Sequence, residues 1–190
     1  MMDKCLNVKG LFCDKNVNLY NKNTLTKGAT YYYVVMNYNQ VEDVSLFHSQ
    51  TTKSSNTKVI SATQDGILKA KYPGVAKVTV KPAAGSGLSM SKTLVVLPSK
   101  VTGVKLTAKK KAMKVAWKKT AGASGYKVYR ATSKKGKYTC VKTASSKTTS
   151  FTNKKLKKNK KYYYKVCAFV KSGKKTYNGA YSTVVMKKAK

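Results

Sequence analysis

The hydrophobic residues of this chain recur with a period of two over short runs, and no other feature constrains its fold as strongly. In Met113–Lys118 the odd-numbered positions are apolar and the even-numbered positions hold two lysines and an alanine. Tyr162–Ala168 alternates in the same way. Successive side chains of a β-strand point to opposite faces of its sheet, so both runs predict strands that bury one face. No segment repeats with the 3.6-residue period of an amphipathic helix.

Similar runs follow one another along the chain and are separated by turn residues. Asp65-Gly66 and Pro73-Gly74 are dipeptides typical of turns between strands. Short strands at this spacing predict an antiparallel β-sandwich. The predicted strands are 30–36, 58–62, 66–70, 74–80 and 91–97 in the first half, and 101–106, 113–118, 125–130, 138–142, 162–169 and 181–186 in the second.

Length and one proline divide these strands into two domains. A β-sandwich domain of the immunoglobulin type takes about 100 residues, and the chain has 190. Length alone is also compatible with one larger sandwich. Pro98 cannot continue a central strand, and the density of lysine rises after it. We therefore predict an all-β fold of two tandem immunoglobulin-like antiparallel β-sandwiches, residues 1–98 and residues 99–190.

Positive charge is concentrated in the second half. The chain has 40 Lys and Arg against five Asp and Glu, a formal charge of +35, and all five acids precede residue 66. Residues 100–190 hold 27 lysines and Arg130 without any acid, a formal charge of +28. Such a field attracts polyanions: nucleic acid, teichoic-acid-like polymers, acidic glycans or an anionic membrane surface. Charge alone does not choose among these partners.

The four cysteines, Cys5, Cys13, Cys140 and Cys167, form no CxxC pair. Two disulfides are arithmetically compatible with this number, but the spacings do not resemble a dense secreted scaffold, so we predict mostly free thiols. The alternation places Cys167 on the outward face of its strand. Neighbouring lysines would lower the pKa of an outward thiol, although an inert surface cysteine is the favoured interpretation.

The chain shows no segment for secretion or membrane insertion. Its N-terminus has no apolar stretch of the length that a signal peptide needs, and no run approaches the ~20 apolar residues of a membrane span. We expect a soluble chain. It would act outside the cell or on the cell surface, as a piece of a longer exported protein, or on the surface of a virion.

Catalytic and metal-binding chemistry find little support in the sequence. His48 is the single histidine, with Glu42, Asp43 and Ser49 nearby. A Glu/His/Ser constellation is the weaker interpretation and a polar loop histidine the favoured one. Glu42 and Asp43 are adjacent, so in a strand they would point to opposite faces and share no substrate. Five scattered acids do not form an oxygen cluster for Ca²⁺ or Mg²⁺. We predict no enzyme activity, no metal and no cofactor.

The second half resembles a fibronectin type III domain. Trp117 in the second strand and Gly125–Arg130 in the third carry the resemblance, together with Leu156 six residues before Tyr162. The Leu156–Tyr162 spacing is that of the tyrosine corner, in which a phenol closes a crossover by bonding to upstream backbone. The resemblance implies structural roles for Trp117, Leu156 and Tyr162. Lys158 stands where the family usually has proline.

The first half resembles a bacterial Ig-like group 2 domain. Ser54–Ala62, Asp65–Ala70 and Pro73–Val80 form the core of this resemblance, and Leu25–Tyr31 is similar to an early strand of the family. Phe47 stands near the position of an expected tryptophan. The two domains together, rich in lysine, are similar to repeat modules of Gram-positive surface proteins and of phage virions. The resemblance implies spacers, adhesins or weak glycan binders, and the fold does not settle which.

A lysine-rich stretch of the second half is the predicted polyanion-binding site, with Tyr163 beside it. Tyr162 and Tyr164 are predicted to be core residues, so only Tyr163 faces outward. The single arginine disfavours a dedicated nucleic-acid function, because base readout relies on arginine. The predicted partner is an anionic polysaccharide or cell-wall polymer; a virion decoration protein that contacts other virion or surface domains, and a nonspecific nucleic-acid binder, are the alternatives. The predicted binding lysines are Lys154, Lys155, Lys157, Lys158, Lys160 and Lys161.

Overall fold

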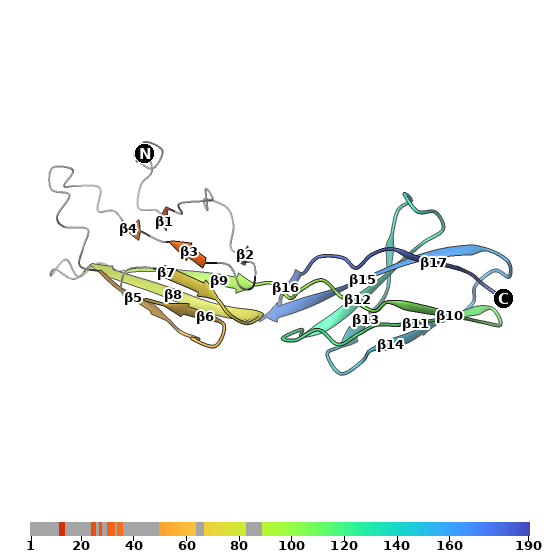
Figure 1. Cartoon of the computed structure of the whole chain (residues 1–190), viewed down its shortest axis with the longest axis horizontal. Coiled ribbons are helices and arrows are strands. Elements are labelled where there is room, and N and C mark those ends of the chain that lie inside the picture. The colour runs from red at the N-terminus through yellow and green to blue at the C-terminus, as the bar shows by residue number, and fades with distance from the viewer. Residues whose placement is uncertain are drawn as a thin grey trace. The chain divides into compact units, whose positions relative to one another are not determined.

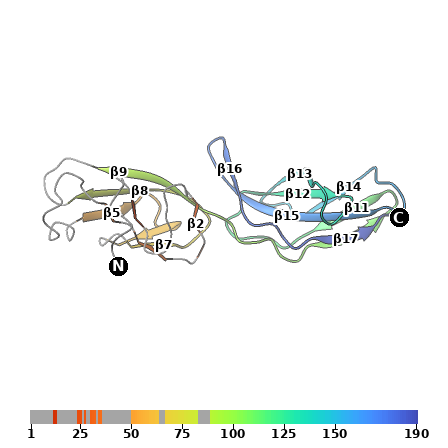
Figure 2. The same cartoon turned by 90° about the horizontal axis from the view of Figure 1, so that it is seen from above.

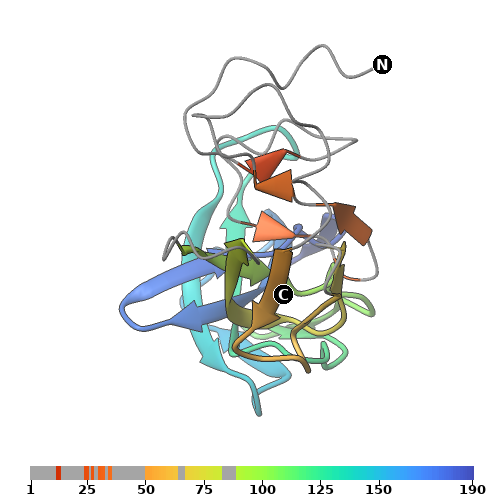
Figure 3. The same cartoon turned by 90° about the vertical axis from the view of Figure 1, so that its left-hand side faces the viewer.

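The structure is a computed structural model that describes residues 12–13, 24–25, 27, 30–32, 34–35, 50–63, 67–82 and 89–190. Figure 1, Figure 2 and Figure 3 draw only strands and their connections in these ranges. The chain divides into two compact units, Met1–Val96 and Leu97–Lys190. The prediction of an all-β fold of tandem sandwiches is confirmed. No helix in the described ranges is long and apolar enough to cross a bilayer.

The described residues of the first unit form three sheets. One has the strand order β2-β9-β8-β5, the second β3-β7-β6, and the third is the pair β1-β4. Among these described strands, β2 and β9 form a parallel pair with Thr24 opposite Val95, and the other pairs are antiparallel. The strands are β1 (Phe12–Cys13), β2 (Thr24–Leu25), β3 (Thr30–Tyr32), β4 (Val34–Val35), β5 (Gln50–Ser54), β6 (Ile60–Ala62), β7 (Ile67–Ala70), β8 (Gly74–Pro82) and β9 (Met90–Val96).

Alternating residues of β6 to β9 form the core of this unit. Ile60, Leu68, Val78 and Leu94 are at most 1% exposed, so side chains from the two larger sheets meet in one layer. The predicted strand 30–36 is instead two short strands in different sheets. Strand β5 was not predicted, because its sequence Gln-Thr-Thr-Lys-Ser has no apolar alternation; its pairing with β8 makes it a strand.

The second unit is a sandwich of a three-stranded and a five-stranded sheet. The first has the order β10-β11-β14, and the second has the order β13-β12-β15-β16 with β17 also paired to β15. All pairs are antiparallel. The strands are β10 (Lys105–Lys109), β11 (Ala112–Ala116), β12 (Gly125–Ala131), β13 (Thr139–Ser145), β14 (Ser150–Asn153), β15 (Lys161–Ser172), β16 (Lys175–Asn178) and β17 (Val185–Lys188).

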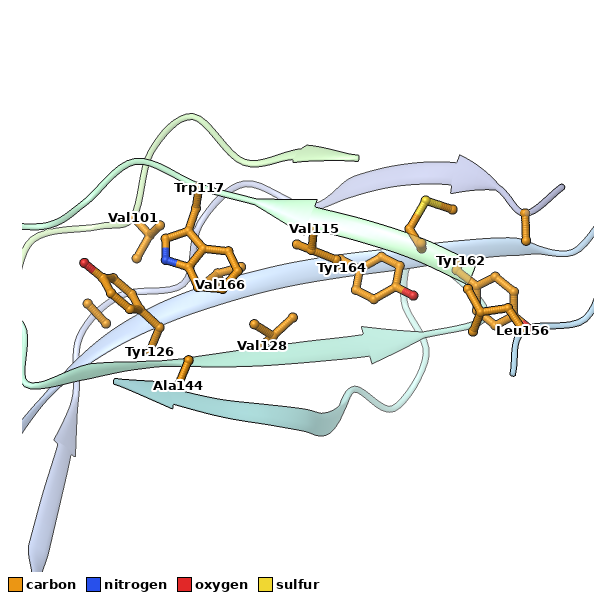
Figure 4. Close-up of a cluster of buried hydrophobic side chains, with 13 residues drawn as sticks. Val101, Val115, Trp117, Tyr126, Val128, Ala144, Leu156, Tyr162, Tyr164 and Val166 are labelled. Carbon is orange, nitrogen blue, oxygen red and sulfur yellow. The ribbon is translucent and has the colours of Figure 1, made fainter. Parts of the chain in front are cut away.

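Aromatic residues fill both ends of the core in this unit. Trp117 packs against Tyr126, with ring centroids 5.5 Å apart, at one end, and Leu156 and Tyr162 lie at the other (Figure 4). Tyr164 is fully buried between them and its phenol oxygen accepts a hydrogen bond from Nδ2 of Asn153. Burial raises the pKa of the Tyr164 phenol, so this group stays protonated and neutral in the core.

Strands β14 and β16 were not predicted, for two different reasons. Only Phe151 in β14 is apolar, and its pairing with β11 defines it as a strand. In β16 the hairpin after β15 supplies the pairing, with Ser172 opposite Lys175 and Gly173 in the turn at a φ of 55°. The last strand begins at Val185 rather than Tyr181, although Ser182 still donates its N–H to the carbonyl oxygen of Val166.

Gly125 lies where β12 passes between β13 and β15 without room for a side chain. A Cβ atom at this position would overlap the carbonyl oxygen of Ala144 and lie 2.5 Å from Cζ of Phe169. We predict that Gly125→Ala lowers the free energy of unfolding by about 2–3 kcal/mol, because the backbone oxygen cannot move aside. Urea unfolding of the full chain, followed by the fluorescence of Trp117, measures this loss.

Gly173→Ala is the matched control for this measurement. No atom lies within 4 Å of a Cβ there, so only its φ of 55° opposes the substitution, at a cost of about 1 kcal/mol. Equal losses in the two variants would contradict the packing explanation for Gly125.

Candidate polyanion-binding site

The predicted binding lysines lie in the loop between β14 and β15, which a tyrosine corner organises. The backbone N–H of Lys157 donates to the phenol oxygen of Tyr162 over 3.0 Å. Leu156 and Tyr162 are both buried (Figure 4). Lys158 is exposed at the position of the usual proline, and the turn closes by a hydrogen bond from the N–H of Lys160 to the carbonyl oxygen of Lys157 at 3.3 Å. The corner thus anchors the loop by its apolar residue and leaves its lysines in solvent.

Backbone hydrogen bonds fasten this loop to two segments that are distant in sequence. The N–H of Leu156 donates to the carbonyl oxygen of Lys111 at 2.9 Å, and the N–H of Lys111 donates to that of Lys190 at 2.7 Å. The N–H of Asn159 donates to the carbonyl oxygen of Ala189 at 2.9 Å. The C-terminal segment and the β10–β11 turn therefore meet the loop at one end of the second unit (Figure 1 and Figure 2).

Three lysine runs converge at this end, and we call them together the lysine pole. Every lysine of the pole is exposed. The loop contributes the six lysines that the sequence predicted, and the β10–β11 turn and the C-terminal segment contribute six that it did not. The lysine pole consists of Lys109, Lys110, Lys111, Lys154, Lys155, Lys157, Lys158, Lys160, Lys161, Lys187, Lys188 and Lys190.

The sequence contained these additional lysines but no signal that they join the loop. Their runs lie more than 25 residues to either side of it. They meet it only because β10 and β11 form a hairpin and β17 pairs with the start of β15.

No acidic side chain balances this charge within the second unit, because residues 100–190 contain no Asp or Glu. Lys161 lies directly opposite Lys188 in the register of β15 and β17. Like charges directly opposite one another destabilise a sheet. The pole is therefore an uncompensated cluster of ammonium groups on a rigid backbone, which is the arrangement that attracts multivalent anions.

The backbone of the pole is strained. Among the described residues, the non-glycine positions with positive φ are Lys111 at 49°, Lys155 at 58° and Asn159 at 63°, and all three belong to the pole or its loop. An L-residue in this region costs about 1–2 kcal/mol relative to the right-handed conformation. Strain of this kind clusters at functional sites, where the surrounding structure holds it in place.

The remaining predicted residues fall on other surfaces or outside the described ranges. Tyr163 is half-buried and lies opposite Ala131, on the face of β15 that is turned away from the core. The predicted constellation around His48 (Glu42, Asp43 and Ser49) lies outside the described residues. No group of three or more metal-ligating side chains occurs in the described part of the chain.

The prediction that Cys167 faces outward at the surface is right about the face of the strand but wrong about exposure. The β12–β15 register puts Cys167 opposite Lys127 on the outer face of the sheet, yet its side chain is 0% exposed because neighbouring side chains cover it. Burial raises the pKa of its thiol, although Lys127 nearby opposes the shift. Cys140 is exposed, and both cysteines are free thiols. The side chains of Cys5 and Cys13 lie outside the description.

Solved structures with the same architecture are fibronectin type III-like. A two-domain fibronectin type III segment of chicken tenascin aligns with a TM-score of 0.57 and 12% identity, covering 86% of this chain and 94% of that one. An Fn3-like protein from Clostridium thermocellum is 27% identical with a TM-score of 0.37, covering 46% of this chain and 88% of its own. No protein-family model and no curated protein matches the sequence.

A glucanase also aligns, but this alignment carries no argument about the function of the chain. The β-1,2-glucanase from Parabacteroides distasonis is 20% identical with a TM-score of 0.40, and the alignment covers 60% of this chain and 18% of the enzyme. The tenascin alignment shows the fold of the chain: tandem β-sandwiches of the fibronectin type III-like kind.

The strain at Lys111 predicts that two substitutions that remove the same charge change the stability in opposite directions. Lys111→Gly removes the strained side chain but keeps both backbone hydrogen bonds, so we expect the free energy of unfolding to rise by about 0.5–1 kcal/mol. Lys110→Gly is the matched control. It removes the same charge from the same turn, but Lys110 has no positive φ, so the added freedom of the unfolded chain lowers stability by about 0.5–1 kcal/mol.

Thermal unfolding at fixed salt measures both variants. A loss of stability in Lys111→Gly equal to that of Lys110→Gly would contradict the assignment of strain to Lys111.

Proposed function

We propose that this chain is a non-catalytic surface module, an adhesin or spacer that acts outside the cell and binds anionic polysaccharides or cell-wall polymers through the lysine pole. The convergence of three exposed lysine runs on one end of an acid-free unit carries the proposal. A polymer with regularly spaced carboxylates, phosphates or sulfates would bridge several of these ammonium groups at once. Each contact would release counterions, which makes the binding strong at low salt.

The composition of the pole favours such polymers over a dedicated nucleic-acid target. Lysine is a strongly hydrated point charge, whereas base readout and bidentate phosphate contacts rely on arginine. Arg130 is the one arginine of the chain, and its guanidinium lies over the ring of Tyr162, 5.5 Å from the centroid. That stacking occupies Arg130 within the sheet, so the pole itself would recognise charge density rather than sequence.

Two sets of lysine substitutions that remove the same charge, one inside the lysine pole and one outside it, test this function. Replacing Lys154, Lys155, Lys157, Lys158, Lys160 and Lys161 by glutamine should weaken binding to teichoic acid and to a sulfated dextran at least about tenfold at ~150 mM salt. The slope of log affinity against log salt should also become shallower. Isothermal titration of the full chain across a salt series provides both numbers.

The control removes six exposed lysines from other parts of the same unit. With the same loss of charge but an intact pole, affinity should fall less than about threefold. Equal weakening in the two variants would mean that net charge alone drives binding. Tight binding of DNA alone at ~150 mM salt would favour the nucleic-acid function instead. The control lysines are Lys105, Lys114, Lys118, Lys134, Lys135 and Lys142, all exposed.

A further inference from the structure

The outer face of the five-stranded sheet carries a second group of side chains. It differs from the lysine pole because it consists mainly of tyrosines. The β12–β15 register places Tyr129 directly opposite Lys165 on this face. The ring of Tyr181 meets that of Tyr129 edge to face, with centroids 5.3 Å apart and an interplanar angle of 87°. Tyr138 and Tyr163 flank them. We call Tyr129, Tyr138, Tyr163, Lys165 and Tyr181 the phenol face.

Lys165 is held between two of these rings. Its Nζ lies 3.8 Å from the ring centroid of Tyr181 and 4.4 Å from that of Tyr138. Tyr138 is itself fixed, because its hydroxyl donates to the carbonyl oxygen of Lys134 at 3.1 Å. Two cation–π contacts at these distances restrict the ammonium to one position. Lys165 thus differs from the lysines of the pole, whose side chains extend into solvent.

The ammonium of Lys165 has no oxygen acceptor in the part of the chain that the structure describes. An ammonium carries three N–H donors, and ring faces satisfy them only weakly. No acidic side chain occurs in the second unit to provide a partner. The ammonium can therefore accept an oxygen group of a ligand in place of water, beside the exposed ring of Tyr181, which is 43% accessible.

The phenols around this position stay neutral. Burial, with the Cys167 thiol and the Tyr181 phenol adding to it, raises the pKa of Tyr129 above its ordinary value. Burial also raises the pKa of Tyr138. Protonated phenols put no negative charge on the face and keep hydroxyl groups available for hydrogen bonds. An anion that approaches Lys165 therefore meets no repulsion from these two groups at neutral pH.

We propose that the phenol face binds one acidic sugar residue of an anionic polysaccharide, with the sugar ring stacked on the face of Tyr181 that Lys165 does not cover and its carboxylate or sulfate reaching past the ring edge to Lys165. A pyranose presents a flat face of C–H groups, which suits the negative face of a tyrosine ring, and hydroxyl groups at its rim, which suit phenols. The proposal rests on the proposed function and narrows it, because it selects polymers of acidic sugar rings over polymers that carry charge alone.

A single-stranded nucleic acid would also offer rings and charge, but the face fits it less well. Bases stack in succession on several exposed aromatic platforms along a basic groove. Here Tyr129 and Tyr181 stand edge to face rather than side by side. Tyr181 is the exposed ring of the phenol face, and its other three tyrosines are half-buried. One ring beside one fixed ammonium matches one acidic sugar.

Three polymers and two substitutions test the proposal on the full chain. Tyr181→Ala removes the stacking ring, and Lys165→Met removes the charge but keeps an unbranched apolar side chain between the rings. The probes are polygalacturonate, which has charged sugar rings, inorganic polyphosphate, which has charge without rings, and oligo-dT. Titrations at ~500 mM salt suppress the contribution of the pole. Each substitution should weaken polygalacturonate binding at least about fivefold and leave polyphosphate binding unchanged.

Tyr177→Ala is the matched control for the loss of a tyrosine. Tyr177 lies on β16 opposite Val170, which shares the core-side face of β15 and not the phenol face. The affinity of the Tyr177→Ala variant for polygalacturonate should equal that of the unmodified chain. An unchanged affinity in Tyr181→Ala, or a larger loss for oligo-dT than for polygalacturonate, would overturn the proposal.

The two sites can fail separately. If the glutamine substitutions of the pole have no effect while Tyr181→Ala still weakens polygalacturonate binding, the pole function fails and the phenol face stands. If the pole variant binds both polygalacturonate and polyphosphate more weakly at ~150 mM salt, and Tyr181→Ala binds both with unchanged affinity at every salt concentration, the proposed function stands and the phenol face is overturned.

Discussion

The alternation of side chains along β15 governs the second unit. Tyr162, Tyr164 and Val166 face inward and fill the core with the residues of β11 and β12. Tyr163 and Lys165, between them, face outward and contribute to the phenol face. Because the side-chain period of a strand is two, a shift of one residue in register would exchange these sets and destroy the core and the face together. Burial of the inner set therefore fixes the geometry of the outer one.

The lysine pole depends on the same strand in a different way. The phenol of Tyr162 holds the loop before β15, and β17 pairs with the start of β15. Backbone hydrogen bonds then position the lysines without using their side chains. A cluster of like charges with strained backbone opposes folding, so the buried core and the backbone ladder must offset it. This division of roles resembles a binding site on a rigid scaffold, where stability and function belong to different atoms.

The two surfaces differ in the physics by which they would select a ligand. Exposed ammonium groups in water act through a field that salt screens over about 8–10 Å, so the pole distinguishes ligands mainly by charge density. Lys165 is fixed between Tyr138 and Tyr181, and a ring stacked beside it is far less sensitive to salt. The pole would bring an anionic polymer to the surface, and the phenol face would distinguish among such polymers by the shape of their residues.

The sequence by itself determined the fold class, most strands and the inward positions of Trp117, Tyr162 and Tyr164, because hydrophobic alternation is a local signal that burial enforces. It failed for β5 and β14, whose residues are mainly polar and which are strands only because a neighbour pairs with them. The sequence likewise indicated a lysine-rich loop. It did not indicate that two distant lysine runs lie beside this loop, or that Lys165 lies between the rings of Tyr138 and Tyr181. Only the tertiary structure decided these, because both arise from contacts between segments far apart in the chain, which no local pattern records.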